Sequence, residues 1–206
     1  NVTGGLQPGN YDVNVSTSDD SVNGSLTVEQ PATATLSELD VAGQGTAATI
    51  TEADNESVTV TLTNTGDQFG GFDVSLDIGT EVSETQQVFE VGPGVSRTVT
   101  FENVTGGLQP GNYDVNVTTD DDSVSGGLIV EQPATADLTD LDIAGQGTSA
   151  TITQGDNESV AVNVTNVGDQ TGSVDVTLGI GTTVTATATT GTLAGGQAAT
   201  VTVANV

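Results

Sequence analysis

The chain has 206 residues, of which 28 are Asp or Glu and only one, Arg97, is Lys or Arg, so its formal net charge is -27 at pH 7. This balance excludes nucleic acid and anionic membrane surfaces as partners, because binding to both depends on Lys and Arg side chains. A soluble surface that does not stick to other molecules is one explanation of the charge. We favour a high-salt habitat, since at about 1 M salt the screening length falls to about 3 Å and the repulsion between carboxylates is largely removed.

Cysteine, methionine and long apolar runs are all missing from the sequence. Without Cys the chain forms no disulfide and no thiolate metal site. A chain without Met that begins at Asn1 is expected to be a fragment or to have lost an upstream segment. No apolar run reaches the roughly 18 residues that span a bilayer, so any anchor and any membrane contact are expected outside these residues.

The opening string NVTGGLQPGNYDVNV recurs without change at Asn103, which defines an internal repeat of 102 residues. Forty of the first fifty aligned residue pairs are identical, and the same register holds to the end of the chain. A period of this length is the size of a domain. The sequence therefore predicts an array of folded domains rather than a solenoid of small units.

Alternation of apolar and polar residues predicts β-strands along the chain. In ESVTVTLTN, the side chains of Val58, Val60 and Leu62 share one face and the Thr side chains share the other. GGFDVSLDIG, RTVTF and NYDVNV alternate in the same way, and turn sequences such as NTGD, GPG and QPGN separate these segments. No stretch has helical spacing. The pattern predicts an all-β chain of tandem seven-stranded immunoglobulin-like antiparallel sandwiches.

The domain boundaries are predicted from the string EQPATA, which occurs at Glu29 and again at Glu131. Its Pro follows a strand directly and ends the pairing of that strand. Residues 32–133 then form one complete domain with strands A to G. Residues 1–31 supply only strands F and G of a preceding domain, and residues 134–206 supply only strands A to E of a following one.

The two partial domains are complementary, because one contains the strands that the other lacks. A sandwich without strands F and G exposes its inner apolar faces and open sheet edges. Two arrangements would cover them: a longer tandem chain that continues in both directions, or separate subunits that complete each other head to tail. Both arrangements give a linear, bead-on-string filament, since a heterologous contact that does not close propagates.

The strings ATLSELDVAGQG, DNESVTVTLTNTGD, FDVSLDIG, SRTVTFENV and LQPGNYDVNV together resemble the CARDB family, the cell-adhesion-related immunoglobulin-like domain. The sequence is particularly similar to the tandem copies in the surface glycoproteins of haloarchaea, and the resemblance covers the whole chain. It implies an extracellular, cell-surface repeat module without catalytic residues.

Eight Asn-x-Ser/Thr sequences are candidate acceptors of an N-linked glycan. They begin at Asn1, Asn14, Asn23, Asn55, Asn103, Asn116, Asn157 and Asn163. Chance occurrence in a chain rich in Thr, Ser and Asn and glycosylation of at least one site are evenly matched interpretations. Asn14, Asn116 and Asn163 are expected on outward strand faces, where a glycan would stand in solvent.

Clustered carboxylates make two turns weak candidates for calcium, which binds 6 to 8 oxygen ligands. The residues are Asp19 and Asp20 in the first turn and Asp120, Asp121 and Asp122 in the second. The EF-hand pattern is not met, because the loop DDDSVSG lacks the later Glu and its Gly is one place late. Solvated turns that carry surface charge are the favoured interpretation, and no other cofactor is expected.

Tyr11 and Tyr113 each follow Leu-Gln-Pro-Gly-Asn, which predicts a tyrosine corner in which the phenol bonds to an upstream backbone group. We expect a structural role for both. Catalysis is not expected, because the chain has no Cys or His and no Ser with a plausible base.

The sequence therefore predicts a structural repeat segment of an extracellular filament, a pilus-like fibre or a surface stalk, whose partner is a copy of itself placed head to tail. Two other functions stay open. The first is an adhesin that recognises a glycan or another cell, and the second is a passive spacer for a flanking domain.

Overall fold

The computed structural model describes residues 4–182 and 184–205, which form strands, turns and bends without any helix. The chain divides into two compact units. The first comprises Asn1–Ala48, Asp54–Leu108 and Asn112–Ile129, and the second comprises Thr49–Ala53, Gln109–Gly111 and Val130–Val206. The all-β class expected from the alternation is confirmed. The domain boundaries at residues 31 and 133 stay a prediction.

The N-terminal hairpin consists of β1 (Gly9–Ser16) and β2 (Ser21–Val28), which pair antiparallel through their whole length. Tyr11 lies opposite Leu26 and Val15 lies opposite Val22, so these four apolar side chains share one face of the hairpin. The hairpin is a two-stranded sheet of its own in the described part of the chain.

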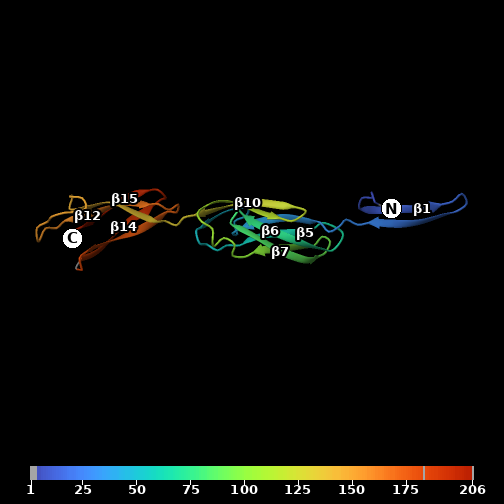
Figure 1. Ribbon diagram of the computed structural model, residues 1–206, viewed down its shortest axis with the longest axis horizontal. Coiled ribbons are helices and arrows are strands. Elements are labelled where there is room, and N and C mark those ends of the chain that lie inside the picture. The colour runs from blue at the N-terminus through green and yellow to red at the C-terminus, as the bar shows by residue number, and fades with distance from the viewer. Residues whose placement is uncertain (1–3, 183, 206) are drawn as a thin grey trace. The chain divides into compact units, whose positions relative to one another are not determined.

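The central sandwich contains eight strands in two layers (Figure 1). They are β3 (Ala34–Val41), β4 (Ala47–Thr51), β5 (Val58–Asn64), β6 (Gly70–Ile78), β7 (Val82–Val91), β8 (Ser96–Phe101), β9 (Gly111–Thr118) and β10 (Ser123–Glu131). One sheet has the order β3-β5-β8 and the other has the order β4-β10-β9-β6-β7. Arg97 lies in β8 at an edge of the smaller sheet, opposite Leu62 of β5.

The core of the central sandwich comes from the alternating positions that the sequence pattern marks as apolar. Val58, Val60 and Leu62 of β5 are buried, whereas the Thr residues between them are half-buried. The largest fully buried side chains include Phe101, Leu62, Leu76, Ile78 and Leu128. Both sheets contribute to this set, so the two layers enclose one core.

The strand count differs from the seven-stranded prediction, because β4 adds an eighth strand beside β10. Ala48 and Ile50 of β4 are buried in alternation with exposed or half-buried Thr residues. The segment is short and follows the Gly-rich turn at Gly43 and Gly45, so its sequence pattern is weak. Its strand conformation depends on the partner β10, which lies far away in sequence.

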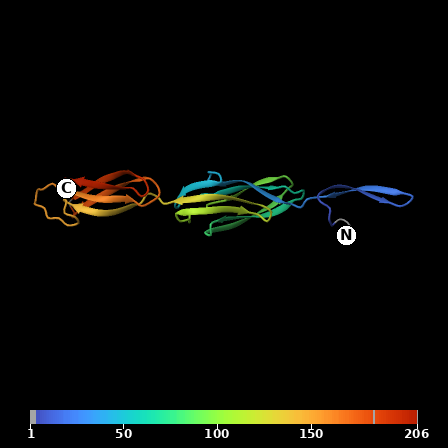
Figure 2. The ribbon, with the colours of Figure 1, turned by 90° about the horizontal axis from the view of Figure 1, so that it is seen from above.

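The second unit contains five C-terminal strands, again in two layers (Figure 2). They are β11 (Ala136–Ile143), β12 (Ser159–Asn166), β13 (Gly172–Ile180), β14 (Val184–Leu193) and β15 (Ala198–Ala204). The sheet β11-β12-β15 repeats the order β3-β5-β8, and the pair β13-β14 repeats β6-β7. Counterparts of β4, β9 and β10 do not occur among the described strands of this unit. We call this five-stranded structure the open sandwich.

A buried Asn holds the segment that leads into each sandwich. Asn64 is fully buried, and its Oδ1 atom accepts hydrogen bonds from the N–H groups of Thr33 (3.1 Å) and Gly66 (3.0 Å). Its Nδ2 group donates to the carbonyl oxygens of Gln68 and Val91, both at 2.8 Å. One side chain thus joins the linker, the β5–β6 turn and the end of β7.

The next residues of the same turn bind the linker directly. The Asp67 carboxylate accepts from the Gln30 N–H group at 2.9 Å, and the Asp67 N–H group donates to the Gln30 carbonyl at 3.0 Å. A Cβ atom on Gly66 would collide with the carbonyl oxygen of Pro31, so only Gly allows this approach. The arrangement recurs at Asn166, Gly168, Asp169, Gln132 and Pro133.

Replacing the buried amide should destabilise the central sandwich. We expect Asn64→Ala to lower its free energy of unfolding by about 2–4 kcal/mol, because the substitution leaves buried backbone groups without partners. Urea unfolding followed by circular dichroism measures this change. Asn116→Ala, at an exposed position of β9, serves as the control and should change the free energy by less than about 0.5 kcal/mol. Equal effects of the two substitutions would contradict the role given to Asn64.

Candidate functional site: a hairpin present in two environments

The hairpin β9–β10 closes the central sandwich. β9 lies between β10 and β6 in the larger sheet, and Val115, Val117, Leu128 and Val130 are all buried. These residues face the sheet β3-β5-β8 across the core. Without β9–β10 that core would lose one of its two walls.

The N-terminal hairpin has almost the same sequence but a different environment. Val13 and Val15 correspond to Val115 and Val117 in the 102-residue repeat. The former are 40% and 62% exposed, whereas the latter are 0% exposed. The valines that are buried in the core at β9 therefore have exposed counterparts in β1. Their face is lined by Leu6, Tyr11, Val13 and Leu26.

The open sandwich likewise exposes apolar residues whose counterparts in the central sandwich are buried. Leu138 and Ile152 are 56% and 54% exposed, whereas their counterparts Leu36 and Ile50 in the central sandwich are 5% and 6% exposed. An apolar groove runs between its layers. The groove is lined by Leu138, Leu141, Val162, Leu178 and Val203. In the central sandwich, β9–β10 covers the corresponding side of the core.

Two further features distinguish the open sandwich from the central sandwich. β13 pairs only with β14 among the described strands, whereas its counterpart β6 pairs with both β7 and β9. Residues 149–153, the counterpart of β4, form no strand. β4 pairs with β10, and no counterpart of β10 lies beside this segment among the described strands of the open sandwich.

Carboxylates of the β9–β10 turn fasten the hairpin to the opposite sheet. Asp121 Oδ2 accepts a hydrogen bond from the Ala34 N–H group, and Asp122 Oδ2 accepts one from the Leu36 N–H group, both at 2.8 Å. Ala34 and Leu36 belong to β3, an edge strand whose alternate N–H groups point away from β5. We call these two contacts the carboxylate latch. It satisfies two edge donors that strand pairing leaves open.

The carboxylate latch lowers the pKa of Asp122. The Leu36 N–H group is the main cause and the Ser123 N–H group adds to it, because both donate to the ionised carboxylate; burial opposes them weakly. A pKa that is lower in the folded than in the unfolded chain adds stability above the ordinary pKa of an aspartate. This contribution disappears as the pH falls through that value toward the folded pKa.

The turn of the N-terminal hairpin has the same internal geometry as the β9–β10 turn. The Asp19 and Asp20 N–H groups donate to Thr17 Oγ1, and Asp20 Oδ1 accepts from the Ser21 N–H group at 2.8 Å. In the β9–β10 turn, Thr119 Oγ1 accepts from Asp121 and Asp122 in the same way. Asp19 and Asp20 therefore occupy the positions of Asp121 and Asp122.

The family comparison agrees with this description of the central sandwich. Residues 36–125 match the CARDB family. They run from β3 into β10 and support a CARDB-like immunoglobulin-like domain, an extracellular, adhesion-related type of module. No curated protein matches the chain. In the described residues, no helix has the length and apolar character needed to cross a membrane.

The weak calcium candidates are divided between the two hairpin turns. Asp121 and Asp122 of the CARDB-like domain bind backbone N–H groups, and Asp120 beside them is exposed. Within the described residues, no three acidic side chains come close enough together to hold a metal ion. Asp19, Asp20, Asp120, Asp121 and Asp122 stay weak calcium candidates, and solvated turns stay the favoured interpretation.

The candidate glycan acceptors lie at separate places on the surface. Asn1 lies outside the described residues. Asn14, Asn23, Asn55, Asn103, Asn116 and Asn157 are exposed. Asn163 in β12 is half-buried, and its Nδ2 group lies 3.5 Å from Thr139 Oγ1 of the neighbouring strand β11. Access for a glycan is therefore poorer at Asn163 than at Asn14 and Asn116, on the exposed faces of β1 and β9.

The two tyrosines lie at the entry to corresponding strands. The Tyr11 hydroxyl donates to the Gln7 carbonyl at 2.8 Å, four residues upstream. Tyr113 is half-buried in the CARDB-like domain, and its ring lies against Gly79 at the end of β6. Both positions are compatible with the expected structural role.

The sequence alone did not identify the side chains that bind each linker to a turn of its sandwich, or those that bind the hairpin β9–β10 to β3. The Asn-x-Gly-Asp turns were visible as repeated turn sequences, but their contacts with Gln30 and Gln132 depend on the fold. The carboxylate latch was visible only as an acidic cluster. The repeat offered one usable signal, because Asp19 and Asp20 recur as Asp121 and Asp122 while the preceding position changes from Ser18 to Asp120.

The latch predicts a pH-dependent difference between the wild type and Asp122→Asn. At neutral pH we expect the substitution to destabilise the CARDB-like domain, because a neutral amide accepts weaker hydrogen bonds than a carboxylate. The difference in urea midpoint should shrink as the pH falls below the ordinary pKa of an aspartate, where the wild type loses the charge as well. Asp114→Asn, at an exposed position of β9, is the control. A pH-independent difference would show that the charge of Asp122 is not what matters.

Proposed function

We propose that this chain is a structural repeat segment of an extracellular filament, a pilus-like fibre or surface stalk, in which copies are joined head to tail. One observation carries the proposal: the same hairpin sequence is buried as β9–β10 and exposed as β1–β2. The open sandwich supplies the groove that such a hairpin fills. The two exposed surfaces are complementary parts of one β-sandwich.

Burial of these faces provides the driving force for association. Fully burying one Val or Leu side chain contributes about 1.5–3 kcal/mol, and each surface exposes several of them. The contact joins two different surfaces, so each added copy presents a new hairpin at one side and a new groove at the other. Contacts of this kind generate filaments when they do not close into rings.

The extracellular setting is supported by the CARDB match at residues 36–125 and by the composition of the chain. The carboxylates keep the filament hydrated and prevent lateral sticking, while the paired β-strands carry the mechanical load. A high-salt habitat fits the charge of -27, since salt screens repulsion between neighbouring copies. The role is structural, without a catalytic site, without a resident cofactor and without contact with nucleic acid or membrane.

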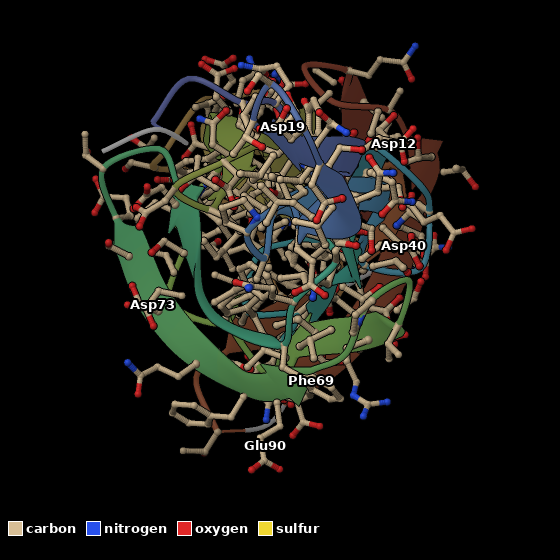
Figure 3. All side chains as sticks on the ribbon, turned by 90° about the vertical axis from the view of Figure 1, so that its right-hand side faces the viewer. Asp12, Asp19, Asp40, Phe69, Asp73 and Glu90 are labelled. Carbon is tan, nitrogen blue, oxygen red and sulfur yellow. The ribbon has the colours of Figure 1, made fainter. Side chains whose placement is uncertain are left out.

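An adhesin is the alternative that a specific observation favours. Phe69, before β6, and Phe89, in β7, are both largely exposed. Figure 3 labels Phe69 together with Asp73 and Glu90, whose carboxylates point outward from the same β6–β7 region. The counterparts of the two Phe residues are Thr171 and Gly191, so this aromatic surface is particular to the central sandwich. Loss of cell attachment on removal of both rings would favour this function over a passive spacer.

Electron microscopy of the native material tests the filament directly. We expect beads that repeat along a thin thread at the spacing of one domain. The proposal would be overturned if the images showed only isolated particles at every protein and salt concentration used.

A charge on the inner face of the N-terminal hairpin should block assembly of the purified chain. We expect Val15→Asp to raise the protein concentration needed for assembly at least tenfold, because the carboxylate would be buried in an apolar core. Light scattering and sedimentation measure this concentration. Asn14→Asp is the matched control, since it adds the same charge to the adjacent residue on the opposite face. Equal assembly of the two variants would contradict the use of this face.

Salt should promote assembly of the wild-type chain. Between about 0.1 M and 1 M NaCl the screening length falls from about 10 Å to about 3 Å, which weakens the repulsion between acidic copies. We expect assembly at a protein concentration at least tenfold lower in the higher salt. Sucrose is the control, because it favours burial of apolar surface without screening charge. Assembly that weakens as salt is added would contradict this explanation of the charge.

A further inference from the structure

We infer that the N-terminal hairpin of one copy docks in the open sandwich of a second copy in the register of β9–β10, with Gly24 against Thr148 and with Asp19 and Asp20 on the edge of β11. This inference rests on the proposed function and specifies the contact that joins the copies.

The register follows from the pairing of β9 with β6. In the central sandwich, Ser75, Leu76, Asp77 and Ile78 lie opposite Thr118, Val117, Asn116 and Val115. The 102-residue shift converts these pairs to Thr177 with Ser16, Leu178 with Val15, Gly179 with Asn14 and Ile180 with Val13. The edge of β13 that would receive β1 has no partner among the described strands. A shift by one residue would place the apolar face of the hairpin in solvent.

Gly24 has room for a larger side chain within its own chain. Nothing lies within 4 Å of a Cβ atom built on Gly24, and its backbone is not in the left-handed region. Its counterpart Gly126 is required, because a Cβ there would collide with the carbonyl oxygen of Thr46 and lie 3.2 Å from Leu39. The counterparts of Thr46 and Leu39 are Thr148 and Leu141 in the open sandwich. Gly24 therefore suits a docked hairpin, in which these groups approach it.

Asp19 and Asp20 are already held in the geometry of a carboxylate latch. Their turn makes the same Thr-centred hydrogen bonds as the β9–β10 turn, so docking requires no rearrangement of the turn. In the docked register Asp19 meets the N–H group of Ala136 and Asp20 meets that of Leu138, the counterparts of Ala34 and Leu36. Charge-assisted hydrogen bonds of this kind are stronger than neutral ones.

A compensating pair of sequence differences supports the same contact. The residue between the two latch donors is Thr35 in β3 but Asp137 in β11, which adds a negative charge to the receiving strand. The residue before the latch acceptors is Asp120 in the β9–β10 turn but Ser18 in the N-terminal hairpin, which removes one. The number of charges at a latch between copies therefore equals the number at the latch within the central sandwich.

The first test replaces Gly24 in the full 206-residue chain. Gly24→Val favours the strand conformation of β2 and meets nothing in the free hairpin, yet its side chain would collide with the receiving sandwich. We expect the concentration needed for assembly to rise at least tenfold. Ser25→Val is the matched control, because Ser25 is exposed on the opposite face of β2, opposite Asp12. This control should assemble like the wild type.

The second test removes a latch acceptor. Asp20→Ala should raise the concentration needed for assembly about tenfold, since it deletes the charged acceptor for the Leu138 N–H group. Ser18→Ala, in the same turn, should have little effect. Circular dichroism of each variant checks that the central sandwich stays folded.

The third test fixes the register with cysteine, which the native chain lacks. One chain carries Asn14→Cys and another carries Gly179→Cys, where a Cβ atom has open space. Directly opposed residues in an antiparallel pair have Cα atoms about 4.5–5.5 Å apart, a distance that a disulfide spans. We expect a covalent pair of chains after mixing and oxidation. Thr27→Cys, on the other strand of the hairpin, should not cross-link to Gly179→Cys.

The outcomes separate the inference from the proposed function. A wild-type chain that does not associate at any concentration or salt level overturns both. A wild-type chain that associates, with Gly24→Val and Asp20→Ala equally competent or with Thr27 cross-linking in place of Asn14, overturns the inference and leaves the filament standing. Loss of assembly in the two variants, together with the expected cross-link, supports both.

Discussion

Closure of a two-layer core is the constraint on which the rest of this structure depends. The inner face of β3-β5-β8 is dry because β9 and β10 complete the opposite sheet. Among the described strands, the equivalent sheet β11-β12-β15 faces the pair β13-β14. Val164 and Val201 are buried there, but Leu138 and Leu141 are exposed. The two sandwiches belong to one chain and share the 102-residue repeat, although β14 and β7 differ at most positions. The strands β9 and β10 are a major difference between them that bears on the burial of the core.

Negative charge has a structural use in this protein besides its effect on the surface. Edge strands leave alternate N–H groups without strand partners, and an acidic turn residue is a suitable acceptor for them. Asp121 and Asp122 use this chemistry on β3, and Asp67 and Asp169 use it on the linkers. Mutual repulsion elsewhere on the surface is the accompanying cost, which salt reduces.

The fold was predictable wherever period-two alternation was strong, as in β5, where Val58, Val60 and Leu62 alternate with Thr. The correspondence of β1–β2 to β9–β10 was also predictable from the 102-residue repeat, whereas the domain boundaries drawn from it stay a prediction. The strand β4 was missed, since its conformation depends on β10 rather than on its own five residues. The roles of Asn64 and Asp122 depend on contacts between distant segments, which a single sequence does not specify.

The position of Arg97 has a consequence for digestion of the protein. Proteases that cleave after Lys or Arg find one such residue in the 206-residue chain, and it lies in β8, paired with Leu62 of β5. A protease must bind its substrate as an unpaired extended segment, so cleavage there requires β8 to detach from its sheet. Reagents that modify lysine amines find no lysine side chain. Resistance to trypsin-like enzymes is therefore a by-product of a composition that favours acidic residues.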